Sequence, residues 1–444
     1  MKRSISLILI AYLLIIHIRC KSSQLPMGEH LIGISNSGAI KIDSSSFQSG
    51  FTACEPTICI NPASPNHIVA GSILNNVYHS HDGGRSWSQQ KLSSTMGVYG
   101  DPVIRADMNG QFYYAHLSDP DDAPYRSEAF LDRIVVQTST DQGKTWSDGS
   151  HPAVRGTKDQ DKQWMAVDPT TNTVYMTWTE FDKYGSKKPE DKSRILFSKT
   201  VNAGQSWSEP KSINQYNGDC LDSDLTTEGA VPAVGPRGQV YVTWSYNHKL
   251  YFDKSLDGGD TWMKQDKIVA DQFEGWDISV PGFGRVNGMP VTEVDLSQGP
   301  HRGRIYINWA DQRNGTDDTD IWCISSDDQG ETWTDPKRVN DDAAGKHQFF
   351  SWMDVDPKTG YIYIVFYDRR HFPDNRTDVY LAYSTDGGTS FVNTKINEST
   401  FTPSSMVFLG DYNDISAYDN QIRPIWTQMD KAGTSIWTAL LSMQ

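Results

Sequence analysis

One eight-residue pattern recurs six times along this chain and limits the folds that the chain can adopt. The pattern reads Ser/Thr-x-Asp/Asn-x-Gly-x-Ser/Thr-Trp/Phe, and its copies begin at Ser80, Ser139, Thr200, Ser255, Ser326 and Ser384. The closing aromatic residues lie 59, 61, 55, 71 and 58 residues apart. A recurrence at this spacing indicates a repeat architecture, in which each copy belongs to one of several equivalent units.

Each copy is predicted to be a turn between two strands. The Asp side chain is expected to accept backbone N–H groups two residues further along, as in an Asx-turn. The Gly supplies a positive φ without steric cost, and the closing Trp offers apolar surface for packing between units. Segments of alternating, β-branched and aromatic residues, such as 133–138 and 319–324, precede the copies and are predicted strands.

This pattern resembles the Asp-box, or BNR repeat, of sialidases and other β-propeller proteins. Six copies in register over about 300 residues predict a propeller, and the resemblance extends over nearly all of the chain that follows the N-terminal segment. The resemblance also implies that the boxes are structural turns rather than catalytic groups.

A second repeat lies upstream of each box and allows the units to be counted. It consists of a short strand, a turn and a longer strand rich in aromatic residues. Its copies begin at Thr57, Pro102, Trp164, Val231, Pro290, Trp352 and Tyr412. The seventh copy has no box after it, and one further strand, 435–441, ends the sequence. Six units therefore have four strands and the last has three.

The missing strand is expected to come from the N-terminal segment, because an unpaired sheet edge would otherwise remain. The segment Leu31–Asn36 is the natural donor. We therefore predict an all-β, seven-bladed propeller closed by an N-terminal strand, with the six blades of sialidase catalytic domains as the alternative. The expected divisions are a signal at 1–20, an N-terminal segment at 21–50 and the propeller at 51–444.

Composition narrows the choice of partners. With 444 residues and 11% aromatic side chains, the chain suits one large all-β domain. The net charge of −15 argues against nucleic acid or an anionic membrane surface as the partner. We expect a monomer that meets a membrane only through a lipid anchor.

Residues 1–20 have the features of an export signal. Lys2 and Arg3 precede an apolar run, 5–18, that is short for a membrane span. Cys20 and the Lys-Ser-Ser that follows resemble the lipidation site of a bacterial lipoprotein, although 17–19 is a poor version of the usual small residues before it. We expect a surface lipoprotein, with a secreted or periplasmic protein and a retained anchor as alternatives.

Four further cysteines leave two alternatives open. Cys54, Cys59, Cys220 and Cys323 could form disulfides in an exported protein, or remain as buried thiols in strands. Their spacing does not match a zinc site.

The expected topology places a ligand site at one end of the axis. In a blade of four antiparallel strands, the inner strands start, and the second strands end, on the face opposite to the box turns. We call this the entry face, and the other the box face. A concave opening with convergent polar groups is the usual place for a ligand.

Residues at these positions are unusually rich in carboxylates, arginines and aromatic groups. The candidate contacts are Glu55, His116, Trp164, Arg285, Arg313, Trp352, Arg369, Arg370 and Asp411. The arginines could bind a carboxylate or sulfate through their planar forks. The alternative for Arg313, Arg369 and Arg370 is an ion pair with a neighbouring acid, and for the tryptophans it is packing between blades.

The family resemblance implies catalytic roles for three residues. Sialidases combine an arginine triad, a Tyr/Glu pair and an Asp acid, and some glycosidases of this kind depart from the two-carboxylate scheme. By that resemblance Asp101 is the acid, Glu228 the base and Tyr412 the nucleophile. The Arg-Ile-Pro segment of that family is absent, and 54–57 stands in its place.

We carry three hypotheses for function. The first is an exported, sialidase-like glycoside hydrolase acting on an anionic glycan. The second is a lyase on a uronate-containing polysaccharide, in which His116, Tyr246 or Tyr412 would transfer protons. The third is a surface propeller that binds a glycan or protein without catalysis, which is favoured if each arginine is paired to an acid.

No cofactor is expected, although calcium remains open. The loops 311–320 and 368–378 are rich in Asp, and oxygen ligands of this kind bind Ca²⁺. Their spacing is not that of an EF-hand, and turn chemistry explains the acids equally well.

Overall fold

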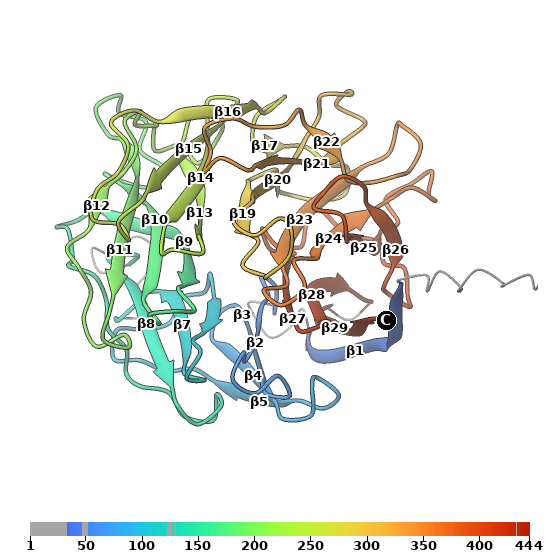
Figure 1. Ribbon diagram of the computed structural model, residues 1–444, viewed down its shortest axis with the longest axis horizontal. Helices are drawn as coiled ribbons and strands as arrows, with labels where there is room; N and C mark the ends of the chain where they lie inside the picture. The colour runs from blue at the N-terminus through green and yellow to red at the C-terminus, as the bar shows by residue number, and fades with distance from the viewer. Residues whose placement is uncertain (1–32, 47–51, 122–126, 128–129, 432) are drawn as a thin grey trace, which may run out of the picture. The chain divides into compact units, whose positions relative to one another are not determined.

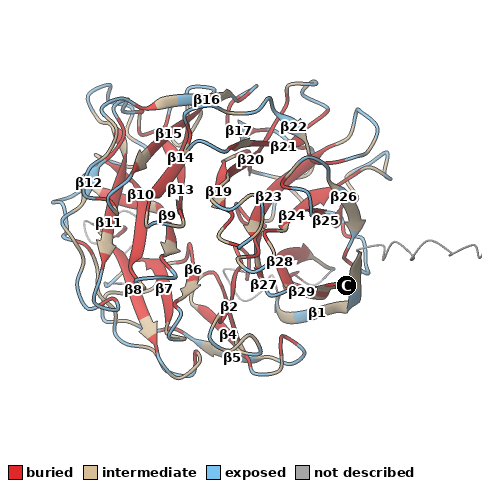
Figure 2. Cartoon of the chain, in the orientation of Figure 1, coloured by how far each residue is buried: buried red, intermediate tan, exposed pale blue. Residues whose placement is uncertain are grey.

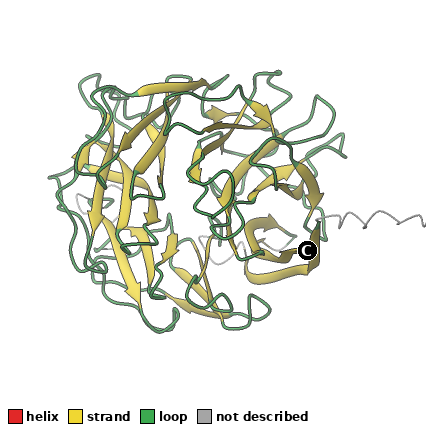
Figure 3. Ribbon diagram, viewed as in Figure 1, coloured by secondary structure: helices red, strands yellow, loops and turns green. Residues whose placement is uncertain are grey.

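The computed structural model describes residues 33–46, 52–121, 127, 130–431 and 433–444. Within these ranges the regular structure consists of strands, and seven sheets stand around one axis as a β-propeller (Figures 1 and 3). The prediction of seven blades is confirmed. No helix in the part of the chain described here is long and apolar enough to cross a membrane.

The blades follow one another along the chain, and each lists its strands from the axis outward. The first three are β2 (Thr57–Ile60), β3 (Ile68–Ser72), β4 (Asn76–Ser80) and β5 (Ser88–Lys91); β6 (Val103–Ala106), β7 (Phe112–Leu117) and β8 (Ile134–Ser139); β9 (Asp159–Val167), β10 (Val174–Phe181), β11 (Ser193–Thr200) and β12 (Lys211–Ser212). In the second blade the outer position is reduced to one bridge, between Val136 and Ser150.

The remaining blades have the same order. They are β13 (Glu228–Val234), β14 (Val240–Tyr246), β15 (Lys249–Ser255) and β16 (Lys267–Asp271); β19 (Val291–Val294), β20 (Ile305–Asp311), β21 (Asp320–Ser326) and β22 (Lys337–Arg338); β23 (Gln348–Val355), β24 (Ile362–Asp368), β25 (Asp378–Ser384) and β26 (Val392–Lys395); β27 (Asp414–Tyr418), β28 (Gln421–Met429), β29 (Gly433–Met443) and β1 (Ile34–Ser46). A small ribbon, β17 (Asp277–Ile278) with β18 (Val286–Asn287), connects the fourth and fifth blades.

Strand β1 closes the ring as predicted. It pairs antiparallel with β29, from Ile34 opposite Met443 to Ser46 opposite Gly433. The strand starts later and is longer than the expected donor 31–36, of which Leu31 and Ile32 lie outside the described residues. Its second half is polar because an outermost strand faces solvent on one side, so the sequence there carries no apolar signal.

Burial follows the position of each strand in its blade. Inner and middle strands such as β10 and β24 are buried along their whole length, whereas outer strands such as β5 are mostly exposed (Figure 2). All four described cysteines are buried free thiols, so the alternative of a disulfide is wrong for them.

The box turns hold their Asp side chain differently from the expected Asx-turn. In the fourth box, Asp257 accepts the backbone N–H of Thr261 at 2.8 Å and its hydroxyl at 2.6 Å, four residues on rather than two. Ser255 in turn accepts the N–H of Gly259 at 2.7 Å. These hydrogen bonds to the carboxylate lower the pKa of Asp257.

The boxes also join each blade to the one before it. The ring of Trp262 packs edge-on against Phe197 of the third blade, with centroids 4.9 Å apart. Gly259 has a φ of +88°, and a Cβ added there would lie 2.2 Å from a ring carbon of the same Phe197. The glycine is therefore required both by its backbone conformation and by the neighbouring blade.

We predict that Gly259→Ala destabilises the propeller far more than Gly345→Ala. Gly345 has the same backbone conformation, with φ +89°, but open space where the Cβ would lie. A left-handed non-glycine residue costs about 1–2 kcal/mol, and overpacking adds about 1–3 kcal/mol. Urea unfolding of both variants measures the difference, and equal losses would contradict the role assigned to the contact with Phe197.

Candidate functional site

Charged side chains gather where the inner strands begin, on the entry face. Six carboxyl groups and two cations interact with one another there, and we call this set the acid cluster. Its members are Glu55, Asp101, Asp161, Asp222, Glu228, Asp411, Lys162 and Arg285. They come from the first, second, third, fourth and seventh blades and from the loops that connect them.

A shared backbone distortion accompanies these side chains. Glu55, Asp101, Lys162 and Phe350 all have a positive φ, between 46° and 52°, at the same place in four different blades. Pairing of the inner strand with its neighbour is irregular at this place in β9 and β23, and such bulges bend a strand and redirect its side chains. Backbone strain of about 1–3 kcal/mol per residue is typical of functional sites.

Lys162 is the central cation of the acid cluster. Its Nζ lies 2.6 Å from a carboxylate oxygen of Asp411 and 3.5 Å from one of Asp101. The attraction of Lys162 and then of Arg285 outweighs burial and lowers the pKa of Asp411. Asp411 is therefore held as a carboxylate.

Arg285 binds two acids of the cluster at once. Its guanidinium lies 3.1 Å from Asp411 and 2.9 Å from Asp222. Tyr184 donates its hydroxyl to the other side of Asp222 at 2.6 Å. Arg285, the single arginine among the predicted contacts that reaches the cluster, is thus already paired.

The other acids of the cluster hold their protons more tightly than usual. Burial, followed by the negative charge of Asp101, raises the pKa of Asp161 to about 8. Burial and the charges of Asp222 and Asp161 raise the pKa of Glu228 well above its usual value. Neither carboxyl oxygen of Glu228 has a hydrogen-bond partner among the residues described. Asp161 is partly exposed, whereas Glu228 is fully buried.

Three aromatic rings close the axis beneath the acid cluster. The centroids of Trp164 and Trp352 lie 4.2 Å apart, and that of Tyr412 lies 5.1 Å from Trp164. We call these three residues the aromatic layer. Together with Lys162 and Asp411 it lines a small cavity of about 20 Å³. The tryptophans thus pack against each other across the axis.

The structure places the predicted Tyr/Glu pair apart in its interactions. The Tyr412 hydroxyl has no hydrogen-bond partner among the described residues. Burial and then the charges of Asp101 and Glu55 raise its pKa, so no neighbouring carboxylate takes its proton. Asp101 and Glu55 do lie in the cluster, where Glu55 accepts the backbone N–H of Asp411 at 3.2 Å.

Two of the predicted arginines lie at the periphery of their blades. Arg313 binds Asp311 at 2.6 Å and stacks over Trp322. Arg370 binds Asp368 at 2.8 Å and stacks over Tyr380 in the same manner. This repeated Asp-x-Arg arrangement turns each guanidinium outward over the third strand, away from the axis, and matches the ion-pair alternative.

The remaining predicted contacts are buried away from the cluster. Arg369 donates to the Thr377 hydroxyl at 3.1 Å and lies over Phe349. His116 is fully buried beside the Leu117 carbonyl, 2.8 Å from its Nδ1, and burial lowers its pKa to about 4. The structure therefore brings together no arginine triad.

The acids of the two Asp-rich loops bind cationic side chains. Asp320 lies 2.6 Å from Arg338, and Asp378 lies 2.9 Å from Lys395. Within the described ranges no group of His, Cys, Asp and Glu is arranged to hold a metal ion.

Sequence reasoning missed three residues of this site. Lys162 stands at an inner-strand start, so its position alone could have identified it. Asp222 and Tyr184 lie in loops outside both repeats, and only the fold brings them to Arg285.

Comparisons with known proteins agree with this architecture. Residues 137–148 match the family model described as BNR/Asp-box repeat. An ulvan lyase, solved with a glucuronate–rhamnose sulfate ligand, is 13% identical with a TM-score of 0.54, over 92% of this chain and 96% of that one. A protein of unknown function from Dyadobacter fermentans is 13% identical with a TM-score of 0.51, over 93% and 100%.

A Hadza microbial sialidase is 14% identical with a TM-score of 0.49, over 85% of this chain and 73% of that one. The chain therefore carries an Asp-box repeat, and it resembles sialidases and related propeller enzymes at low sequence identity.

We predict that Lys162→Met destabilises the protein by about 3–5 kcal/mol, because it leaves buried carboxylates unpaired. Lys249→Met is the control, since its pair with Asp271, at 2.7 Å, is exposed and worth about 0–1 kcal/mol.

The loss in Lys162→Met should be larger at pH 8 than at pH 6. Acids with raised pKa values bind protons in the folded state, so stability falls as pH rises through the range in which they ionise. Asp161, with a pKa of about 8, places that range near neutrality. Thermal unfolding across pH measures this, and a loss independent of pH would contradict the proposed charge balance.

Proposed function

We propose that the protein is a carbohydrate-active enzyme that hydrolyses a glycosidic bond at the acid cluster. The observation that carries this proposal is the coexistence of a carboxyl group that holds its proton, Asp161, and a carboxylate that is held ionised, Asp411. Titratable groups whose pKa values are pushed apart in one site are typical of acid/base pairs.

Asp161 is the proposed general acid. It is partly exposed, so it can reach a substrate, and at neutral pH it carries the proton that a leaving glycosidic oxygen needs. This differs from the acid expected by resemblance, Asp101, which is bound to Lys162 at 3.5 Å. The ionised carboxylates of the cluster would then stabilise the positive charge that develops on the sugar ring.

The sign of the charge favours hydrolysis over a lyase reaction. Six acids face two cations, Lys162 and Arg285, and both cations are already paired. An oxocarbenium-like transition state is positively charged, whereas abstraction of a proton next to a uronate carboxylate develops negative charge. The same balance supports a neutral sugar, rather than the anionic one expected from the resemblance, at the reacting position.

A glycan-binding propeller without catalysis is the second candidate. It is supported by the pairing of Arg285, Arg313 and Arg370 with acids, and by the small volume of the cavity above the aromatic layer, about 20 Å³.

We predict that Asp161→Asn lowers kcat/KM by about 10²–10⁴-fold, the range that general acid catalysis supplies. Neutral, sialylated and uronate-containing glycans are screened, and the best substrate is used. Wild-type activity should fall as pH rises through about 8, as Asp161 loses its proton, and this limb should disappear in the variant.

Asp253→Asn is the matched control. Asp253 is buried in β15, outside the cluster, and burial likewise raises its pKa, to about 7. Hydrolysis that is unaffected by Asp161→Asn would overturn the assignment of the acid. Binding of a glycan without cleavage of any substrate would establish the second candidate, and release of an unsaturated uronate would establish a lyase.

We also propose that the chain is exported and lipidated at Cys20, which lies outside the described residues. In a bacterial host, Cys20→Ser should move the protein from the membrane fraction to the soluble one. Mass spectrometry of the mature N-terminus tests this directly, and a chain that lacks a lipid or begins at another residue would refute it.

A further inference from the structure

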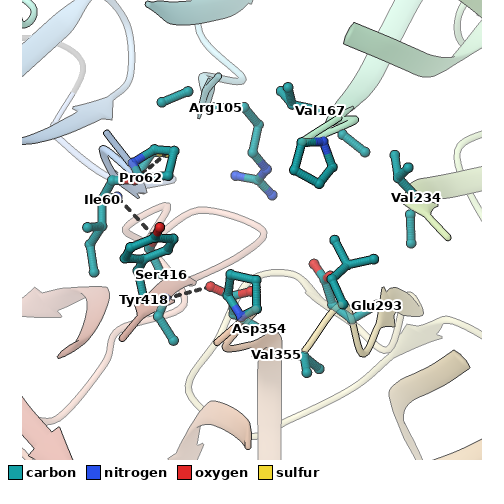
Figure 4. Close-up of a pocket in the computed structure, with 18 of the residues that line it drawn as sticks. Ile60, Pro62, Arg105, Val167, Val234, Glu293, Asp354, Val355, Ser416 and Tyr418 are labelled. Carbon is teal, nitrogen blue, oxygen red and sulfur yellow. Dashed lines mark hydrogen bonds between the residues drawn. The ribbon is translucent and has the colours of Figure 1, made fainter. Parts of the chain in front are cut away.

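A larger cavity lies at the other end of the axis, on the box face. Its volume is about 400 Å³, and the last residues of all seven inner strands line it (Figure 4). Sites for small molecules usually have volumes of about 300–1,000 Å³. The aromatic layer, which stands earlier on the inner strands, lies between this cavity and the acid cluster. The two ends of the axis are therefore separate sites.

The cavity exists because small residues occupy an equivalent position in several blades. This position comes two residues before the end-of-strand Asp, Asn or Gly in most blades. It holds a small side chain in four of them, Cys59, Ala166, Ala233 and Ser416. The other three blades place Arg105, Glu293 and Asp354 there, and these side chains point into the same space (Figure 4).

The single arginine of this group already has a partner. Asp414 is completely buried below it, and Arg105 lies 3.8 Å from its carboxylate. Asp414 is further fixed by the Thr57 hydroxyl at 2.8 Å. One positive and one negative charge therefore offset each other, and Glu293 and Asp354 remain.

Glu293 and Asp354 leave an excess of negative charge in the cavity. Asp354 accepts the backbone N–H of Ala417 at 2.6 Å through one oxygen. Neither residue has an ion-pair partner within 4 Å in the part of the chain that the structure describes. Around them the wall is aliphatic, with Ile58, Val167 and Val234 among its members.

We propose that this cavity binds a small organic cation with an apolar body. Its ammonium group would lie between Glu293 and Asp354, and its hydrocarbon part would pack against the aliphatic wall. An anion of the same shape is disfavoured, because Arg105 already faces Asp414 and two further acids are close. Lys358 stands over the ring of Tyr418, 5.3 Å from its centroid, and adds one exposed positive charge to the lining.

The protonation of both acids should couple to binding. Burial raises the pKa of Asp354 to about 7 and that of Glu293 well above its usual value. Arg105 acts in the opposite direction on both, while Asp414 adds to the rise and Asp356 adds to that of Asp354. A bound cation favours the ionised acids, so its affinity should increase as pH is raised from 6 to 8.

Calorimetric titration of the whole protein with three six-carbon probes tests the proposal. At pH 8, hexylammonium should bind at least tenfold more tightly than hexanol or hexanoate, and its affinity should fall on going to pH 6. Glu293→Gln should weaken its binding at least tenfold. Glu398→Gln, at an exposed position outside the cavity, is the control and should have no effect.

A second variant tests the cavity without changing its charge. Ala166→Leu fills part of the space and should prevent binding, provided that circular dichroism shows an intact fold. The proposal is overturned if no probe binds, if hexanoate binds as well as hexylammonium, or if both Glu293→Gln and Ala166→Leu leave the affinity unchanged. None of these readouts depends on hydrolysis of a glycan.

Discussion

Closure of the ring by β1 and β29 is the constraint on which the rest of the structure depends. The two strands pair along nearly their whole length, from Ile34 opposite Met443 to Ser46 opposite Gly433. Only in a closed ring do seven inner strands share one axis, and only then do residues such as Glu55 and Asp411 meet. The entropic cost of bringing such distant segments together grows slowly with chain length, so it is met by packing between blades.

Filling the axis is the second problem that a ring of seven blades must solve. Trp164, Trp352 and Tyr412 fill the middle of the axis, and polar residues occupy both ends. On the entry face, backbone strain and charge are concentrated in one site, where acids outnumber cations. On the box face, small residues leave room beside Glu293 and Asp354. The same strands thus supply two sites of different character.

Most of the fold could be predicted from the sequence, because a period of about 60 residues and the count of strands between boxes define the blades. The position of the site on the entry face rests on the same topology. The arginines could not be placed in this way. Arg313 and Arg370 turn outward because Asp311 and Asp368, two residues earlier, and the rings of Trp322 and Tyr380 hold them.

The antiparallel pairing of β1 with β29 has a mechanical consequence. Because Ile34 lies opposite Met443, the chain enters and leaves the ring at one point, on the same edge of one blade. A force applied between residues 34 and 443 would therefore separate these two strands one hydrogen bond at a time, rather than shear them all together. The seam that completes the ring is thus also the place where tension would open it, before any other blade feels the load.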